Sequence, residues 1–177
     1  MARLHLPIHD ATRFVLVGPH YPENVGAAAR ALKTMGFSKL VLVKPGRLAS
    51  PEHEMARKMA VKSLDVLEAA RLCDSLGEAV DGVDLVFATT SRRGVSGVLV
   101  PREAARVAAL ATSRGESLAV VFGNEKTGLS QPDLALSHER VRIPMAAPQP
   151  SVNLAQSVQV IAYELMLAGL DARTSAG

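Results

Sequence analysis

Three short segments carry the glycines and polar side chains that a binding or catalytic site needs. In the first, Val121–Gln131 (VFGNEKTGLSQ), an apolar run ends in Gly123, Asn124 and Glu125, with Gly128 close behind. Because glycines let a backbone approach a ligand closely, this pattern alone indicates a phosphate or cofactor loop. The same residue types are also ordinary turn formers, and a lone Glu in a turn is usually solvated.

The second segment, His20–Phe37 (HYPENVGAAARALKTMGF), places Asn24 six residues before Arg30. Asn24 stands where an N-cap would, directly ahead of a helix predicted to begin at Val25, and capping alone could account for it. Arg30, taken alone, is read most simply as a solvent-facing charge. The small residues between the two would let another backbone approach this helix closely.

The third segment, Ile143–Leu165 (IPMAAPQPSVNLAQSVQVIAYEL), begins as an irregular stretch and continues as a helix. Ser151 can be explained as the N-cap of that helix, with Asn153 in its first turn. The exposed N–H groups at such a helix start can bind polar or anionic groups.

Other common kinds of site are not indicated. The first strand-to-helix junction, Gly18–Gly26, lacks the G-x-G-x-x-G spacing of dinucleotide-binding folds, and the sequence contains no P-loop motif. The five histidines have neither metal-ligand spacing nor cysteine partners, so no metal is expected. The single cysteine, Cys73, excludes an internal disulfide and fits a reducing cytoplasm; it is expected to be a small buried side chain.

Taken together and in this order, the three segments resemble the motifs of the SPOUT superfamily of RNA methyltransferases, on its SpoU/TrmH branch. Asn24 and Arg30 belong to a P-x-N-x-G-x-x-x-R pattern that matches the first motif of the branch. Thr-Thr-Ser at Thr89–Ser91, followed by two arginines, approximates the T-S-x-R pattern of the TrmJ-type tRNA ribose methyltransferases, which the chain resembles most. The resemblance spans roughly Phe14 to Leu167 and rests on three motifs rather than one.

The resemblance implies an S-adenosylmethionine-dependent enzyme without a metal, and it assigns roles to particular residues. Glu125 is expected to hold Arg30 or neighbouring backbone in place. The catalytic residues implied are Asn24, Arg30, Glu125, Ser151 and Asn153. Those implied to bind the cofactor are Thr89, Thr90, Ser91, Gly123, Ile143, Pro150, Ser151, Val152 and Leu154. Those implied to meet RNA are Arg30, Arg92 and Arg93.

The elements that must position these residues alternate along the chain, which predicts an α/β fold with a mainly parallel sheet flanked by helices. Strands are predicted at 14–18, 40–43, 85–88, 118–122 and 141–143, where the chain has near-continuous apolar runs. Helices are predicted at 25–35, 51–70, 76–80, 101–112, 132–136 and 152–170. A single domain over residues 1–173 is expected, with a frayed tail at 174–177. The resemblance adds a C-terminal trefoil knot and a homodimer.

The expected activity is methyl transfer to a ribose 2′-hydroxyl, with a pyrimidine of the tRNA anticodon loop as the favoured target. Two alternatives stay open: ribosomal RNA as the substrate, or an RNA-binding protein that has lost catalysis. The net charge of +3 permits a polyanionic partner, and the scarcity of aromatic residues favours chemistry on a ribose over stacking of several bases. No apolar run approaches the ~20 residues needed to span a bilayer, so a cytoplasmic protein is expected.

Overall fold

The computed structural model describes residues 4–175, and within them seven strands form one sheet in which every neighbouring pair is parallel. The strand order is β3-β2-β1-β6-β4-β7-β5. The strands are β1 (Thr12–Val17), β2 (Lys39–Val43), β3 (Arg71–Cys73), β4 (Leu85–Thr89), β5 (Val98–Leu99), β6 (Leu118–Phe122) and β7 (Glu139–Val141). The expected α/β architecture with a parallel sheet is therefore confirmed.

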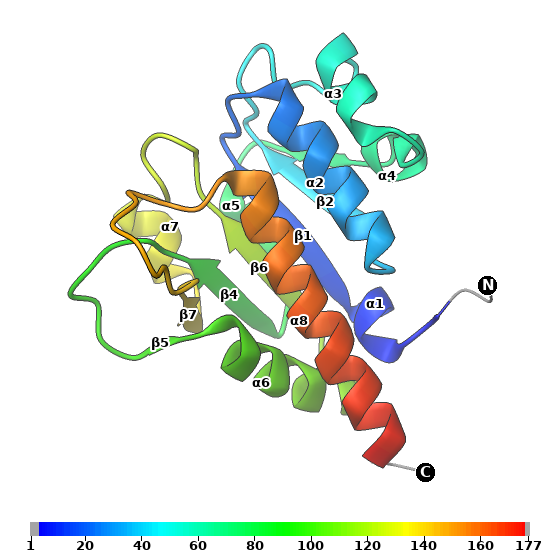
Figure 1. Cartoon of the computed structure of the whole chain (residues 1–177), viewed down its shortest axis with the longest axis vertical. Helices are drawn as coiled ribbons and strands as arrows, with labels where there is room; N and C mark the ends of the chain where they lie inside the picture. Colours follow the sequence, from blue (N-terminus) through cyan, green and yellow to red (C-terminus); the bar gives the residue numbers. More distant parts are fainter. Residues whose placement is uncertain (1–3, 176–177) are drawn as a thin grey trace.

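Helices cover both faces of this sheet. In Figure 1, α2 and α8 lie side by side on the near face, and these two helices are in contact. The helices are α1 (Pro7–Ala11), α2 (Pro22–Thr34), α3 (Glu54–Ala60), α4 (Leu64–Glu68), α5 (Leu76–Val80), α6 (Pro101–Ser113), α7 (Gln131–Ala135) and α8 (Leu154–Ser175). No helix within residues 4–175 combines the length and the apolar character needed to cross a membrane.

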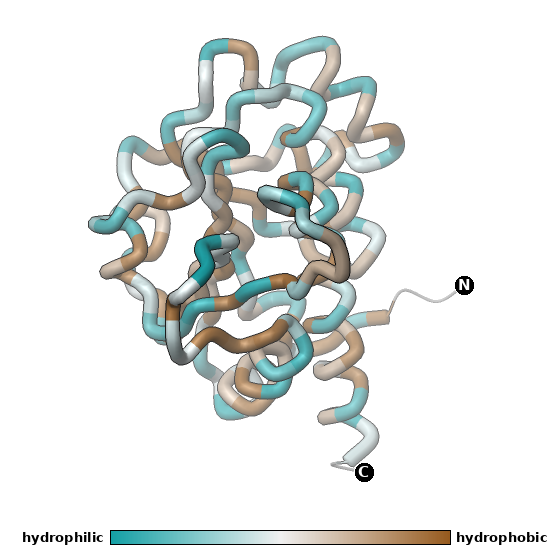
Figure 2. The backbone as a smooth tube through the Cα atoms, turned by 60° about the vertical axis from the view of Figure 1, so that its left-hand side comes forward, coloured by the Kyte–Doolittle hydropathy of each residue, from teal (hydrophilic) through white to brown (hydrophobic). Residues whose placement is uncertain are grey.

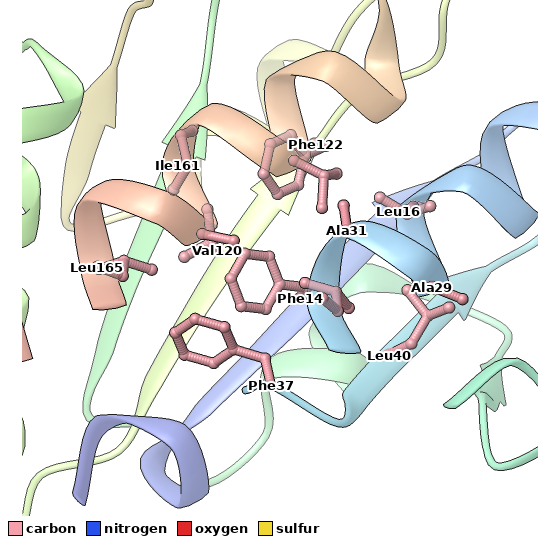
Figure 3. Close-up of a cluster of buried hydrophobic side chains, with 14 of the residues drawn as sticks. Phe14, Leu16, Ala29, Ala31, Phe37, Leu40, Val120, Phe122, Ile161 and Leu165 are labelled. Atoms are coloured by element: carbon pink, nitrogen blue, oxygen red, sulfur yellow. The ribbon is translucent and has the colours of Figure 1, made fainter. Parts of the chain in front are cut away.

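The alternation of side chains along the central strands divides the core into two clusters. In β1, Phe14 and Leu16 face α2, α6 and α8, whereas Val15 faces α5 and α7. Figure 3 shows the larger cluster, in which Phe14 and Val120 from the sheet meet Ile161 of α8. Figure 2 shows hydrophilic residues in the loops and, alternating with hydrophobic ones, along the helices. Both faces of the sheet are thus buried, which explains why its central strands read as continuous apolar runs.

The helix predicted over residues 51–70 is wrong as one element, because the structure divides it into α3 and α4. The break lies at Val61, whose φ of +53° is incompatible with a continuing right-handed helix. The helix also begins later than predicted, since His53 is its N-cap and accepts a hydrogen bond from the main-chain N–H of Met55.

Three short elements were not predicted: α1, β3 and β5. The last strand was also misplaced, since β7 ends at Val141 rather than beginning there. Helix α8 runs through Ser175, two residues into the stretch expected to fray, and residues 176–177 lie outside the described residues. Cys73 is buried at the end of β3, as expected.

Candidate active site

A cleft of about 620 Å³ opens at the edge of the sheet where the parallel strands end. Its walls are the loops that follow β4, β6 and β7, together with the start of α2. All nine residues expected to bind the cofactor line it, namely Thr89, Thr90, Ser91, Gly123, Ile143, Pro150, Ser151, Val152 and Leu154. Of the five residues expected to be catalytic, the cleft brings together Asn24, Glu125, Ser151 and Asn153.

A chain of side-chain hydrogen bonds joins three of these residues across the cleft. Asn153 Nδ2 donates to Asn24 Oδ1 over 3.0 Å, and Asn24 Nδ2 donates to Glu125 Oε1 over 3.0 Å. Glu125 also accepts hydrogen bonds from the main-chain N–H groups of His20 (2.8 Å) and Tyr21 (3.2 Å). The Glu125 carboxylate therefore holds the backbone that leads into α2, which is one of the two roles expected for it.

Asn24 is not the N-cap of α2, contrary to the capping interpretation. The helix begins at Pro22, three residues before the predicted start at Val25, and its N-cap is Tyr21. Proline suits the first helical position because its missing N–H would be unpaired there. Asn24 therefore lies within the first turn, where it is only 8% exposed and its amide is free to bridge Glu125 and Asn153.

The residue that caps α8 is Asn153, so capping does not account for Ser151. Helix α8 begins at Leu154, and the Asn153 side-chain oxygen accepts from the main-chain N–H of Gln156 over 3.2 Å. The Asn153 amide uses its oxygen to cap the helix and its nitrogen to reach Asn24. Ser151 lies exposed in the loop before the helix and lines the cleft.

The loop after β6 turns back tightly on itself. A Cβ at Gly123 would lie 2.4 Å from both the carbonyl carbon of Gly128 and the nitrogen of Leu129, so only glycine fits there. Asn124 bridges this loop to the end of β1, because its side chain donates to the Gly18 carbonyl and accepts from the Lys126 N–H. The turn predicted from the glycines is thus confirmed, and its residues Gly123 to Leu129 line the cleft.

The segment after β4 is tied to both neighbouring loops. Thr90 N donates to the Val141 carbonyl over 2.9 Å, and Arg92 Nη2 donates to the Leu129 carbonyl over 3.2 Å. A second guanidinium group, that of Arg142, donates a hydrogen bond to the Arg92 carbonyl. Arg92 was expected to meet RNA; in this structure it lines the cleft and joins two of its walls.

Two of the expected site residues do not line the cleft of this chain. Arg30 is exposed on α2. Within residues 4–175, the Glu125 carboxylate forms neither a hydrogen bond nor a salt bridge with the Arg30 guanidinium group. Arg93 is exposed in the loop after β4. Both guanidinium groups are therefore available to a partner outside this chain.

The environment of Glu125 favours its ionised form. Burial raises the pKa of the carboxyl, but the hydrogen bonds from Asn24 and from main-chain N–H groups outweigh it, so the pKa lies below its ordinary value of 4.5. The group is thus a carboxylate at neutral pH and acts as a hydrogen-bond acceptor. Within residues 4–175, no group of three or more His, Cys, Asp or Glu side chains is placed to hold a metal ion.

Sequence reasoning missed two residues at the mouth of the cleft, Tyr21 and Lys126. Both stand inside the quoted motifs, directly before Pro22 and directly after Glu125, so their positions were a usable signal. Their neighbour His20 is also exposed, and its ring is in edge-to-face contact with the ring of Tyr21.

Comparison with curated proteins gives relatives that are similar over nearly the whole chain. The tRNA (cytidine/uridine-2′-O-)-methyltransferase TrmJ of Pectobacterium atrosepticum is 41% identical over 170 residues, which cover 95% of this chain and 68% of the relative. The tRNA (cytidine/uridine/adenosine-2′-O-)-methyltransferase TrmJ of Pseudomonas aeruginosa is 40% identical, over 93% of this chain and 63% of the relative. The chain thus spans about two thirds of the length of these relatives.

Solved structures share the fold. A probable methyltransferase from Bordetella pertussis Tohama I matches with a TM-score of 0.85 and 38% identity, over 92% of this chain and 95% of that one. The SpoU methyltransferase AviRb of Streptomyces viridochromogenes, solved in complex with AdoMet, matches with a TM-score of 0.70 over 93% of this chain and 60% of that one. At 21% identity, this second likeness concerns the fold alone.

A family model described as the SpoU rRNA Methylase family matches residues 11–163, which contain all of the cleft residues named above. The match covers far more than half of the chain, and it agrees with the curated relatives in the class of reaction. The chain therefore belongs to the SpoU rRNA Methylase family.

Proposed function

We propose that this protein transfers a methyl group from S-adenosylmethionine to a ribose 2′-hydroxyl of tRNA, with a cytidine or uridine as the target nucleoside. The observation that carries the proposal is the bonded chain Asn153–Asn24–Glu125, which stands against a cleft lined by every residue expected to bind the cofactor. The choice of tRNA rests on the relatives named TrmJ, which are about 40% identical to this chain.

The cleft suits a nucleoside-containing cofactor. Its volume of about 620 Å³ lies in the range of small-molecule sites, roughly 300–1,000 Å³. Its walls combine apolar side chains such as Ile143 and Leu154 with short hydroxyls and with the tight Gly123 turn, which brings main-chain groups close to a ligand. The residues present thus fit S-adenosylmethionine, whose chemistry is to supply a methyl group on a positively charged sulfur.

In the proposed reaction, the residues of this chain bind and orient rather than form covalent bonds. Glu125 fixes the start of α2, and Asn24 and Asn153 fix each other, so that polar groups face the ribose in one arrangement. The hydroxyl of Ser151 lies at the same opening. Positioning of this kind aligns the 2′-oxygen with the methyl group and excludes unproductive geometries.

We propose that Arg30 binds an RNA phosphate and stabilises the negative charge that develops on the 2′-oxygen. A guanidinium stays protonated in proteins, so electrostatic stabilisation is an easier role for it than proton abstraction. Because Arg30 does not line the cleft of its own chain, we propose that it acts across a homodimer, on the cleft of the partner copy. We also propose that the C-terminal segment carries the trefoil knot that the resemblance implies.

The experiment that tests the function is methyl transfer from labelled S-adenosylmethionine to unmodified total tRNA and, separately, to ribosomal RNA. We expect label in tRNA, mapped to a ribose 2′-oxygen in the anticodon loop. Label in ribosomal RNA alone would favour the second candidate substrate, which the description of the matching family supports. Binding of S-adenosylhomocysteine without transfer to either RNA would instead favour an RNA-binding protein that has lost catalysis.

A further inference from the structure

Three exposed side chains from two loops meet at the mouth of the cleft, and we refer to His20, Tyr21 and Lys126 as the mouth cluster. The rings of His20 and Tyr21 are in edge-to-face contact, with centroids 4.7 Å apart. Lys126 Nζ lies 3.3 Å from His20 Nε2 and 5.8 Å from the centroid of the Tyr21 ring. Tyr21 and Lys126 also line the cleft, so the mouth cluster adjoins the proposed site of methyl transfer.

Tyr21 differs from the phenylalanines of this chain in its exposure. The four phenylalanines are all at most 1% exposed, whereas Tyr21 is 44% exposed. The other tyrosine, Tyr163, lies on α8 and does not line the cleft. The position of Tyr21 is fixed, because its main-chain N–H donates to Glu125 and Pro22 follows it at the start of α2. The cleft therefore presents one aromatic ring to solvent on a rigid support.

The positive charge of Lys126 has no carboxylate partner among residues 4–175. Its neighbour Glu125 already accepts hydrogen bonds from Asn24 and from two main-chain N–H groups. An ammonium group has three donors, so the contact with His20 leaves donors free for a ligand. The loop that carries Arg47 lies alongside, since Gly46 N donates to the Pro19 carbonyl over 2.8 Å. The mouth of the cleft is thus a place for an anion next to an aromatic ring.

We propose that the mouth cluster binds one nucleotide of a single-stranded segment of the RNA substrate: its base stacks on the ring of Tyr21, and its phosphate meets Lys126. This combination of an aromatic face and an unpaired cation is how proteins hold unpaired nucleotides. The inference rests on the proposed function, and it deepens that function by assigning a subsite for a base outside the reacting ribose. It also gives a reason for the enzyme to prefer a loop over a duplex, since a base in a duplex is already stacked.

The test compares RNA binding, cofactor binding and transfer kinetics in variants of the full chain. For Tyr21→Ala we expect the dissociation constant for tRNA, and the KM for tRNA, to rise by about tenfold, as loss of one base-stacking contact predicts. Tyr21→Phe keeps the ring and should bind tRNA as the wild type does. The affinity for S-adenosylhomocysteine, measured by calorimetry, should be unchanged in both variants.

The charge is tested by the salt dependence of tRNA binding. Lys126→Ala should reduce the slope of log K against log salt by about 0.7, the value for one phosphate contact to a single strand, and Lys126→Arg should restore it. Lys58→Ala is the matched control, because Lys58 is exposed on α3 and does not line the cleft. An equal change in Lys58→Ala would overturn the assignment of a local phosphate site.

Two other results would also overturn the inference. A fall in S-adenosylhomocysteine affinity in Tyr21→Ala would show that the ring contacts the cofactor. Unchanged tRNA affinity in the same variant would show that no base stacks on Tyr21. Methyl transfer by the wild-type protein distinguishes a failure of this inference from a failure of the proposed function on which it rests. If wild-type protein transfers methyl to no RNA, the proposed function fails; if it does and Tyr21→Ala equals it, only the stacking subsite fails.

Discussion

Glu125 accepts three hydrogen bonds in the site, and their donors lie more than 100 positions earlier in the chain. Removing its charge would leave the N–H groups of His20 and Tyr21 and the Asn24 amide with a weaker acceptor. Of these three donors only the Asn24 amide is buried, and a buried donor that loses its acceptor costs roughly 1–3 kcal/mol. Glu125 is therefore expected to matter for the stability of the fold as well as for the site.

The lowered pKa of Glu125 gives this expectation a pH dependence. The folded-state pKa of Glu125 lies below 4.5, the ordinary value that applies to the unfolded chain. The stabilisation by the carboxylate is therefore fully present above pH 4.5, and it is lost as the pH falls through the lower pKa of the folded state. We expect Glu125→Gln to be less stable than wild type by roughly 1–3 kcal/mol at pH 7. The difference should shrink as the pH falls below 4.5. Urea unfolding of both proteins between pH 7 and pH 3 measures it; a difference that stays constant would refute the assigned bonds.

At the residue scale, the sequence identified side chains that line one cleft but misplaced the caps of two helices. Asn24 and Asn153 both stand near helix starts, and an asparagine in that position is usually a cap. Asn153 does cap α8, yet its nitrogen also binds Asn24, while Asn24 caps nothing. Capping depends on where a helix begins, and a helix start cannot be fixed to one residue from a local pattern.

Among the elements, α2 and α3 pack unusually closely. A Cβ at Gly26 would lie 2.0 Å from the Ala56 carbonyl oxygen, so the two helices touch through backbone at this point. The small residues of the segment predicted that some backbone would approach α2, and the structure identifies the neighbour as α3. Since α2 also carries Asn24 and Arg30, this contact helps to hold the site.

We expect Gly26→Ala to destabilise the protein by about 1–3 kcal/mol, because the added methyl group forces backbone apart. Gly77→Ala is the matched control: Gly77 lies in α5, and its added Cβ would meet only the Ser75 hydroxyl, at an ordinary 3.8 Å. There the change should be neutral or slightly stabilising, since alanine is the better helix former. Urea midpoints of the two variants against wild type decide the matter, and equal stability of both variants would contradict the close contact.

The strands that sequence analysis recovered best are those buried on both faces of the sheet. β6 is buried at every position and was predicted over the same residues that form it. β3 and β5 were missed because they lack that signal: β3 exposes Arg71 and Leu72, and β5 has only two partly buried residues. Short strands of this kind form through pairing with a neighbour, which a local pattern does not reveal.

For the whole molecule, strand order decides which loops share the cleft. β4 lies between β6 and β7, so the loops that follow these three strands adjoin, although the chain visits them in a different order. Sequence analysis predicted the mainly parallel sheet, and in a parallel sheet the loops that follow the strands lie at one edge. It did not predict the order within the sheet, because pairing depends on contacts between segments far apart in the sequence.

The proposed homodimer leads to a prediction about Arg30. Arg30→Ala should reduce methyl transfer by at least roughly 100-fold, the size of effect typical of a lost transition-state contact, while S-adenosylhomocysteine affinity stays close to wild type. Gly123→Val should distort the loop that lines the cleft and so abolish cofactor binding, because its Cβ would collide with the backbone of Gly128. If Arg30 acts on the partner copy, mixed dimers of the two inactive variants should regain activity. Parallel losses of transfer and cofactor affinity in Arg30→Ala would argue against its proposed role.

The hydrogen-bonded chain Asn153–Asn24–Glu125 also affects when the protein becomes functional. Asn24 lies in the first fifth of the sequence, Glu125 in the last third, and Asn153 directly before the final helix. No fragment made early in synthesis therefore contains all three. The cleft is complete only when α8 and the loop before it have docked on the rest of the fold. A ligand that binds only this completed state stabilises it by mass action. Cofactor affinity in this protein therefore reports on whether α8 has docked on the rest of the fold.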